Sequence, residues 1–241
     1  MATIGISLGW RCESAERGVE LGLRAVKAQG YGTCPFDLCV TNYDGMIKCI
    51  KDDFKYFCDP RYLVLKKTPP MRQHLGNNQN DEEFFIYNTY YNFCFNHESP
   101  GHSNLYNTEE WPDGINHFVN NDFQKFIERY QKRIDNFRNY INNDSNNKII
   151  FLLSRYNYVP YELEQALVET YPNLDFQIYC WTNLSQNTIE ITTRKTFDSA
   201  RDFEIEYLKY MGYDDCSHEL DRYSKIEPLV NTSDRIVLHS L

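Results

Sequence analysis

The sequence predicts an α/β fold: a single domain over residues 1–241, with a mostly parallel sheet, helices on both faces and an irregular aromatic-rich central insertion. Three observations lead to this prediction. Residues 148–155 (KIIFLLSR) form a continuous apolar run, which is typical of a strand covered on both faces. Residues 160–172 (PYELEQALVETYP) have helical periodicity between two prolines, and residues 174–182 (LDFQIYCWT) read as the next strand. This order favours two parallel strands.

The N-terminal part has the same strand-then-helix order. Residues 3–9 (TIGISLG) predict a strand, residues 13–28 (ESAERGVELGLRAVKA) a helix, and residues 43–57 (YDGMIKCIKDDFKYF) a second helix with an apolar face. We expect the first strand to lie parallel to the strands at 148–155 and 174–182, beside them or nearly so.

The central stretch departs from this order. Residues 62–67 (YLVLKK) and 83–97 (EFFIYNTYYNFCFNH) are rich in aromatic and β-branched residues and predict one or two strands. Residues 121–141 predict a charged amphipathic helix. Near the C-terminus, residues 187–193 (NTIEITT) predict an edge strand or a hairpin partner, and residues 235–241 (RIVLHSL) a last strand.

Composition limits the possible partners and compartments. The 241 residues carry a net charge of -9, whereas nucleic acids and anionic membranes require a basic face, so we expect neither as a partner. The chain starts without a basic, apolar leader and holds no stretch of about 18 apolar residues, which predicts a cytoplasmic, reducing location. Its eight cysteines occur singly, without a C-x-x-C pair, and we expect them to be reduced thiols.

Polar residues follow the predicted parallel strands at one edge of the sheet, where α/β proteins usually bind ligands. Ser7 and Arg11 follow the first strand and are predicted to contact substrate, together with Arg155 after the strand at 148–155. Arg155 should either pair with a carboxylate such as Asp37 or bind an anionic part of the substrate. Cys12 follows the same first strand and begins a helix, where free N–H groups and the helix dipole stabilise a thiolate.

A thiol nucleophile also needs a base and a group that orients the base. His97 ends an aromatic strand and is the most suitable base, although a buried structural role for Cys12 stays open at this point. Asp37, Asp113 and Asn116 are candidates for the orienting group, and we favour Asp37. The alternative role for Asp37 is to close a turn.

Several motifs taken together carry a family resemblance. They are SLGWRC (7–12), GLRA (22–25), CPFDLCVTNYDGMIKCIKDDFKYF (34–57) and an aromatic strand that ends in a histidine. The chain thereby resembles a family of uncharacterised bacterial and large-DNA-virus proteins described as putative papain-like cysteine peptidases. The resemblance covers roughly the first hundred residues. It implies that Cys12 is the nucleophile and His97 the base, while Leu38 stands where the family has a tryptophan after Pro-Phe-Asp.

Three other functions compete with a thiol mechanism. The spacings of Cys34 with Cys39 and of His97 with His102 occur at zinc sites, but neither pair has the flanking residues of a zinc knuckle, so we expect no metal and no cofactor. A serine hydrolase using Ser7 lacks the usual neighbouring motif. The strongest competitor is a non-enzymatic α/β module that binds a protein partner.

The sequence therefore predicts a thiol-dependent hydrolase, similar to cysteine peptidases, that acts on a peptide or small acyl substrate. The non-enzymatic binding or interaction module is the alternative. The sequence does not decide between an enzyme and an inactive relative, and it does not indicate an oligomeric state. Two polar stretches, residues 76–83 and 101–116, are expected to be surface loops, the second able to cover the site.

Overall fold

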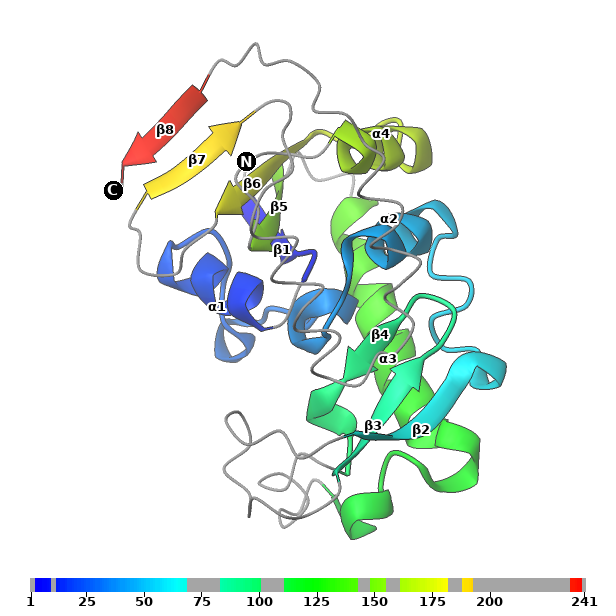
Figure 1. Cartoon of the computed structure of the whole chain (residues 1–241). Helices are drawn as coiled ribbons and strands as arrows, with labels where there is room; N and C mark the ends of the chain where they lie inside the picture. The colour runs from blue at the N-terminus through cyan, green and yellow to red at the C-terminus, as the bar shows by residue number, and fades with distance from the viewer. Residues whose placement is uncertain are drawn as a thin grey trace.

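The structure, a computed structural model, consists of two sheets with helices packed around and between them (Figure 1). It describes residues 3–9, 12–68, 83–100, 111–142, 148–154, 161–181, 188–192 and 235–239. Within these residues the larger sheet has the order β1 (Thr3–Ser7), β5 (Lys148–Ser154), β6 (Phe176–Trp181), β7 (Thr188–Thr192) and β8 (Arg235–His239). The smaller sheet has the order β2 (Leu63–Thr68), β3 (Glu83–Asn88) and β4 (Phe93–Phe95). The helices are α1 (Glu13–Glu20), α2 (Tyr43–Lys51), α3 (Asn120–Ile141) and α4 (Tyr161–Thr170).

The predicted parallel strands are confirmed. β1 pairs with β5 and β5 with β6, both in parallel, with Phe151 opposite Ile6 on one side and Ile178 on the other. The rest of the sheet is antiparallel, since β7 pairs with β6 and β8 with β7. Residues 187–193 therefore supply the antiparallel neighbour of β6, and β8 is the last strand, as predicted.

Helices cover both faces of this sheet. Successive residues of β5 point to opposite sides, and each set of side chains packs against different helices. Ile150 and Leu152 face α1 and pack with Leu21 and Leu23 just beyond its end. Phe151 faces the opposite way and stacks on Phe137 of α3. The core on that side also holds three residues of α4, namely Leu163, Ala166 and Leu167. The predicted fold class is thus confirmed.

The first helix is shorter than predicted. The periodic pattern extends over residues 13–28, but α1 ends at Glu20 and Gly22 follows with a φ of +67°. A residue with a side chain rarely adopts this left-handed conformation, which commonly ends helices at glycine. The chain then turns back along β1, where the carbonyl of Leu23 accepts a hydrogen bond from the Gly5 N–H at 2.8 Å. Residues after Gly22 thus cover the outer edge of the parallel sheet.

The predicted helix at 43–57 also ends early, because Asp53 and Phe54 have positive φ values after α2. The chain continues into the central insertion, which forms three antiparallel strands instead of the predicted one or two. α3 agrees with the predicted helix at 121–141, apart from three left-handed residues at its start.

An aromatic cluster joins the small sheet to the rest of the fold. Phe57 is fully buried and its ring lies 5.4–6.1 Å from the rings of Phe36, Phe93, Phe95 and Tyr130. These partners come from the segment before α2, from β4 and from α3. One side chain therefore connects three parts of the chain that are far apart in sequence.

Residues 76–82 and 101–110, which make up most of the predicted loops, lie outside the described residues. Among the helices that the structure describes, none has the length and apolar character needed to cross a bilayer.

Replacing Phe57 should remove the contacts that join these parts. We expect Phe57→Ala to lower the free energy of unfolding by about 3–5 kcal/mol, as for other buried phenylalanines. Phe84→Ala is the matched control, because Phe84 lies on β3 with 38% of its surface exposed and should lose less than about 1 kcal/mol. Urea unfolding followed by circular dichroism measures both, and equal losses would contradict this assignment of the core.

Candidate active site

The turn after β1 is held by two serine hydroxyls. Gly9 has a φ of +98°, and its N–H donates to Ser7 Oγ at 3.1 Å. Ser14 Oγ donates to the Gly9 carbonyl. Both serines are fully buried. Ser7, predicted to contact substrate, thus has a hydroxyl that is engaged in fixing this turn.

Cys12 follows the turn at the N-terminal cap of α1. Its carbonyl accepts the Glu16 N–H at 2.9 Å, which is the first hydrogen bond of the helix, and its side chain is partly buried. The N–H groups of the first turn of a helix have no partners within the helix and favour nearby negative charge. This location is the one that the sequence predicts for the thiol.

Other described thiols are poorly suited to act as nucleophiles. Burial raises the pKa values of Cys34, Cys39, Cys49 and Cys94, and raises that of Cys58 to about 12. A thiol with such a pKa stays protonated at neutral pH and reacts slowly. Elimination among these side chains therefore also favours Cys12.

His97 lies just after β4, in a single 3-10 turn formed by Asn96–Glu98, and is partly buried. β4 is held in place by an isolated antiparallel pair. The Val40 N–H donates to the Cys94 carbonyl at 2.8 Å, and the Cys94 N–H donates to the Val40 carbonyl at 3.0 Å. The turn with His97 therefore starts from a strand that is fixed to Val40.

The next residue, Thr41, packs against the turn that precedes Cys12. A Cβ atom added at Gly9 would lie 2.0 Å from Thr41 Oγ1, so only glycine fits there. Residues Val40 and Thr41 thus contact both the segment leading to His97 and the segment leading to Cys12. Through these two residues the fold connects the two predicted catalytic segments.

Asp37 closes the turn that precedes this connection. Its Oδ2 accepts the Cys34 N–H at 2.8 Å, and its Oδ1 pairs with Nη1 of Arg24 at 2.7 Å. Burial raises the pKa of the Asp37 carboxyl, and the Arg24 guanidinium opposes that change. The carboxylate thus has the turn-closing role that the sequence offered as the alternative to orienting His97. Asp113, another candidate for orienting His97, lies beside a different histidine: its Oδ2 is 3.6 Å from Nδ1 of His117.

A buried cluster of charges lies beside His97. Glu98 is fully buried, and its Oε1 lies 2.9 Å from Nη2 of Arg133 and 3.3 Å from Nη1 of Arg129. Tyr130 donates its hydroxyl to Glu98 Oε2 at 2.9 Å. Burial opposes ionisation of Glu98, but the charges of the two arginines and of His97 outweigh it and lower the carboxyl pKa.

This cluster was not predicted from the sequence, although part of it has a local signal. Arg129 and Arg133 are four residues apart on the predicted helix at 121–141, and therefore lie on one helical face. Tyr130 lies next to them. Nothing in the sequence indicated that this face would meet the residue after His97.

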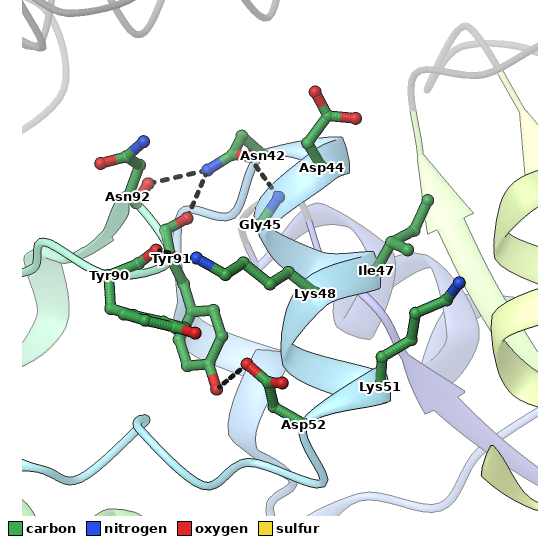
Figure 2. A pocket seen from close by; sticks show the side chains of 10 residues that line it. All are labelled: Asn42, Asp44, Gly45, Ile47, Lys48, Lys51, Asp52, Tyr90, Tyr91 and Asn92. Atoms are coloured by element: carbon green, nitrogen blue, oxygen red, sulfur yellow. Dashed lines mark hydrogen bonds between the residues drawn. The ribbon is translucent and has the colours of Figure 1, made fainter.

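A pocket of about 550 Å³ lies between α2 and the turn that joins β3 to β4 (Figure 2). At one end, Asn42 caps α2 and donates its side-chain amide to the carbonyls of Tyr91 and Asn92. Further along, Nζ of Lys48 lies 3.4 Å from the centre of the Tyr90 ring. Asn42 directly follows Thr41, which packs against Gly9 in the turn before Cys12.

Two predicted substrate contacts, Arg11 and Arg155, lie outside the described residues. Cys34 and Cys39, one of the pairs considered for zinc, are described and buried, whereas His102 is not described. Within the described residues, no group of three His, Cys, Asp or Glu side chains could hold a metal ion.

The comparisons with known proteins agree with the motif resemblance. Residues 4–186 match the family described as "Putative papain-like cysteine peptidase (DUF1796)". The match starts in β1, ends just after β6 and includes Cys12, Asp37 and His97. Neither the comparison with curated proteins nor that with solved structures gives a significant match.

The Glu98 cluster should make stability depend on pH. Because folding lowers the Glu98 pKa below its ordinary value of 4.5, this carboxylate stabilises the fold above that pH and loses its effect as the pH falls through the folded-state pKa. Glu98→Gln leaves Arg133 buried without its partner charge and should lower the free energy of unfolding by about 3–5 kcal/mol at neutral pH.

The difference between wild type and Glu98→Gln should shrink as the pH is lowered below 4.5. Glu128→Gln is the control, since Glu128 lies exposed on α3 and its replacement should change stability by less than about 0.5 kcal/mol. Urea unfolding over a pH series measures both variants. A difference that stays constant with pH would contradict a role for the Glu98 charge.

Proposed function

Because the chain belongs to the family described as putative papain-like cysteine peptidases, we propose that it is a thiol-dependent hydrolase with Cys12 as nucleophile and His97 as base. The observation that carries the proposal is the place of Cys12: it caps the N-terminus of α1, three residues after Gly9 in the fixed turn at the end of a parallel strand. This is the edge of an α/β sheet where ligands usually bind.

The proposed reaction has two steps. His97 takes the proton of the Cys12 thiol, and the sulfur attacks the substrate carbonyl to form a tetrahedral intermediate. The leaving group receives that proton from His97 as its bond to carbon breaks, and a thioester to Cys12 remains. Water then loses a proton to His97 and attacks the thioester, so that the acid is released and the thiol re-forms. This cycle requires Cys12 and His97 within hydrogen-bond reach, about 3 Å or slightly more without substrate.

Two features of the structure support this choice of nucleophile and base. Thr41 packs against Gly9, three residues before Cys12, while the neighbouring Val40 pairs with Cys94, three residues before His97. The two segments are thus anchored to adjacent residues. In addition, burial keeps other described thiols protonated.

We propose that the pocket along α2 receives part of a peptide or acyl substrate. α2 has nine residues, and a helix rises about 1.5 Å per residue. The side of α2 that lines the pocket is therefore long enough to lie beside a short extended peptide. Lys48 offers an ammonium group and Tyr90 an aromatic face (Figure 2). These groups suit a carboxylate or an aromatic side chain near the bond that is cleaved.

Alkylation kinetics test the nucleophile. We expect iodoacetamide to modify Cys12 at least about tenfold faster than the fully buried Cys39 and Cys49, because only a thiolate reacts appreciably. Peptide mapping by mass spectrometry measures each rate. Cys12→Ala should also abolish turnover of peptide and ester libraries without loss of stability. Turnover that survives this change would exclude the thiol mechanism, and no turnover by the wild type would favour the non-enzymatic binding module.

Replacing Lys48 tests the pocket. Lys48→Met should lower kcat/KM about tenfold for substrates that carry a carboxylate side chain, a loss of about 1.4 kcal/mol in transition-state binding. It should leave the rate of Cys12 alkylation by iodoacetamide unchanged, because that reagent is too small to use the pocket. Lys132→Met, an exposed lysine of α3, is the control. Equal kcat/KM values for both variants would place the substrate elsewhere.

A further inference from the structure

The buried charges next to His97 have no part in the proposed reaction. Glu98 is fully buried and Arg133 has 8% of its side chain exposed, and their ion pair of 2.9 Å connects the His97 turn to the middle of α3. Burying an ion pair usually stabilises a protein less than a well-packed apolar pair of the same size. Stability alone therefore gives a poor reason for charges at this position.

The geometry points to a positioning role: we propose that the Glu98–Arg133 pair fixes the 3-10 turn of Asn96–Glu98 and thereby sets where the His97 imidazole lies. This inference rests on the proposed function of His97 as a base. Glu98 is a positioning residue, because its carboxylate acts on the turn and not on substrate.

The contacts of Glu98 restrict the turn from several directions. One oxygen pairs with both arginines and the other accepts the Tyr130 hydroxyl, so rotation of the carboxylate would break at least one of these contacts. Arg133 is itself held, with its guanidinium 4.4 Å from the centre of the Tyr130 ring. The partners all come from α3, whose neighbouring residues pack into the core.

The charge of Arg133 also reaches the segment before Val40. Its charge acts on Asp37 and on Cys39 as well as on Glu98. Asp37 and Cys39 lie just before Val40 and Thr41, which contact β4 and Gly9. A single arginine of α3 therefore pairs directly with the turn that carries His97 and also influences, by its charge, the segment that leads to Val40 and Thr41.

The pH dependence of Cys12 alkylation by iodoacetamide tests this inference in the full chain. In the wild type, a correctly placed imidazole should keep Cys12 reactive at pH values below the range of an ordinary thiol, about 8.5. His97→Ala gives the profile without a base. Glu98→Gln keeps the shape of Glu98 but removes its charge, and should lower the alkylation rate at mildly acidic pH about 10- to 100-fold, towards the His97→Ala profile.

Since Glu98→Gln is also expected to lower stability, Arg133 supplies a second pair of variants. Arg133→Lys keeps the positive charge and should retain more of the low-pH reactivity than Arg133→Met. Arg138→Lys is the control, because Arg138 lies on the same helix and pairs with Asp53 at 2.9 Å, and its profile should equal that of the wild type. Circular dichroism confirms that each variant compared is folded.

The two proposals fail in different ways. Identical profiles for wild type and His97→Ala would overturn both the proposed base and the positioning role. A wild-type profile that depends on His97 but is unchanged in folded Glu98→Gln, or in both Arg133 variants, would overturn the positioning role alone. A shift in Glu98→Gln together with partial rescue in Arg133→Lys is the result that we expect.

Discussion

The backbone pair between Val40 and Cys94 is the contact on which the arrangement of the site depends. It consists of two hydrogen bonds, yet it joins the segment before α2 to the strand that leads to His97. The adjacent Thr41 packs against Gly9, where a side chain would not fit. Gly9 follows β1 of the larger sheet, whereas Cys94 lies in β4 of the smaller sheet. A shift of Val40 and Thr41 would therefore move the Cys12 turn relative to the His97 turn.

The parallel strands and the small antiparallel sheet contribute differently to this arrangement. β1 ends in the turn that precedes Cys12, and its position is set by β5 and by the Leu23 backbone at its other edge. β4 ends just before His97 and is set by β3 and Val40. α3 passes both regions, with Phe137 against β5 and Tyr130 near β4 (Figure 1). The long helix is therefore the common support of the two halves.

The sequence predicted the parallel strands because their signal is local: β5 is a continuous apolar run and its neighbours alternate with helices. The lengths of α1 and α2 were overestimated, since apolar periodicity continues past the residues where Gly22, Asp53 and Phe54 adopt left-handed conformations. Whether periodic residues continue a helix or line a strand edge depends on contacts distant in sequence.

The same distinction applies to the site. Cys12 could be singled out from its place between a strand and a helix, and the turn-closing role of Asp37 was among the roles that the sequence offered. The ion pair of Asp37 with Arg24 could not be predicted, since Arg24 lies 13 positions away along the chain. The meeting of Glu98 with α3 was beyond sequence reasoning for the same reason: Arg129 and Arg133 share one helical face, but Glu98 lies 31 positions before Arg129. Buried charge pairs that join distant segments carry no local pattern.

Trapping the acyl-enzyme tests most directly whether Cys12 carries the chemistry. An activated ester is mixed with the full chain, the reaction is quenched in acid within the first turnover, and the acyl group is located by peptide mass mapping. The proposed mechanism predicts an acyl group on Cys12 that accumulates transiently in the wild type and forms more slowly in His97→Ala. An acyl group located on another residue, or acylation of Cys12 at the same rate in both proteins, would contradict it.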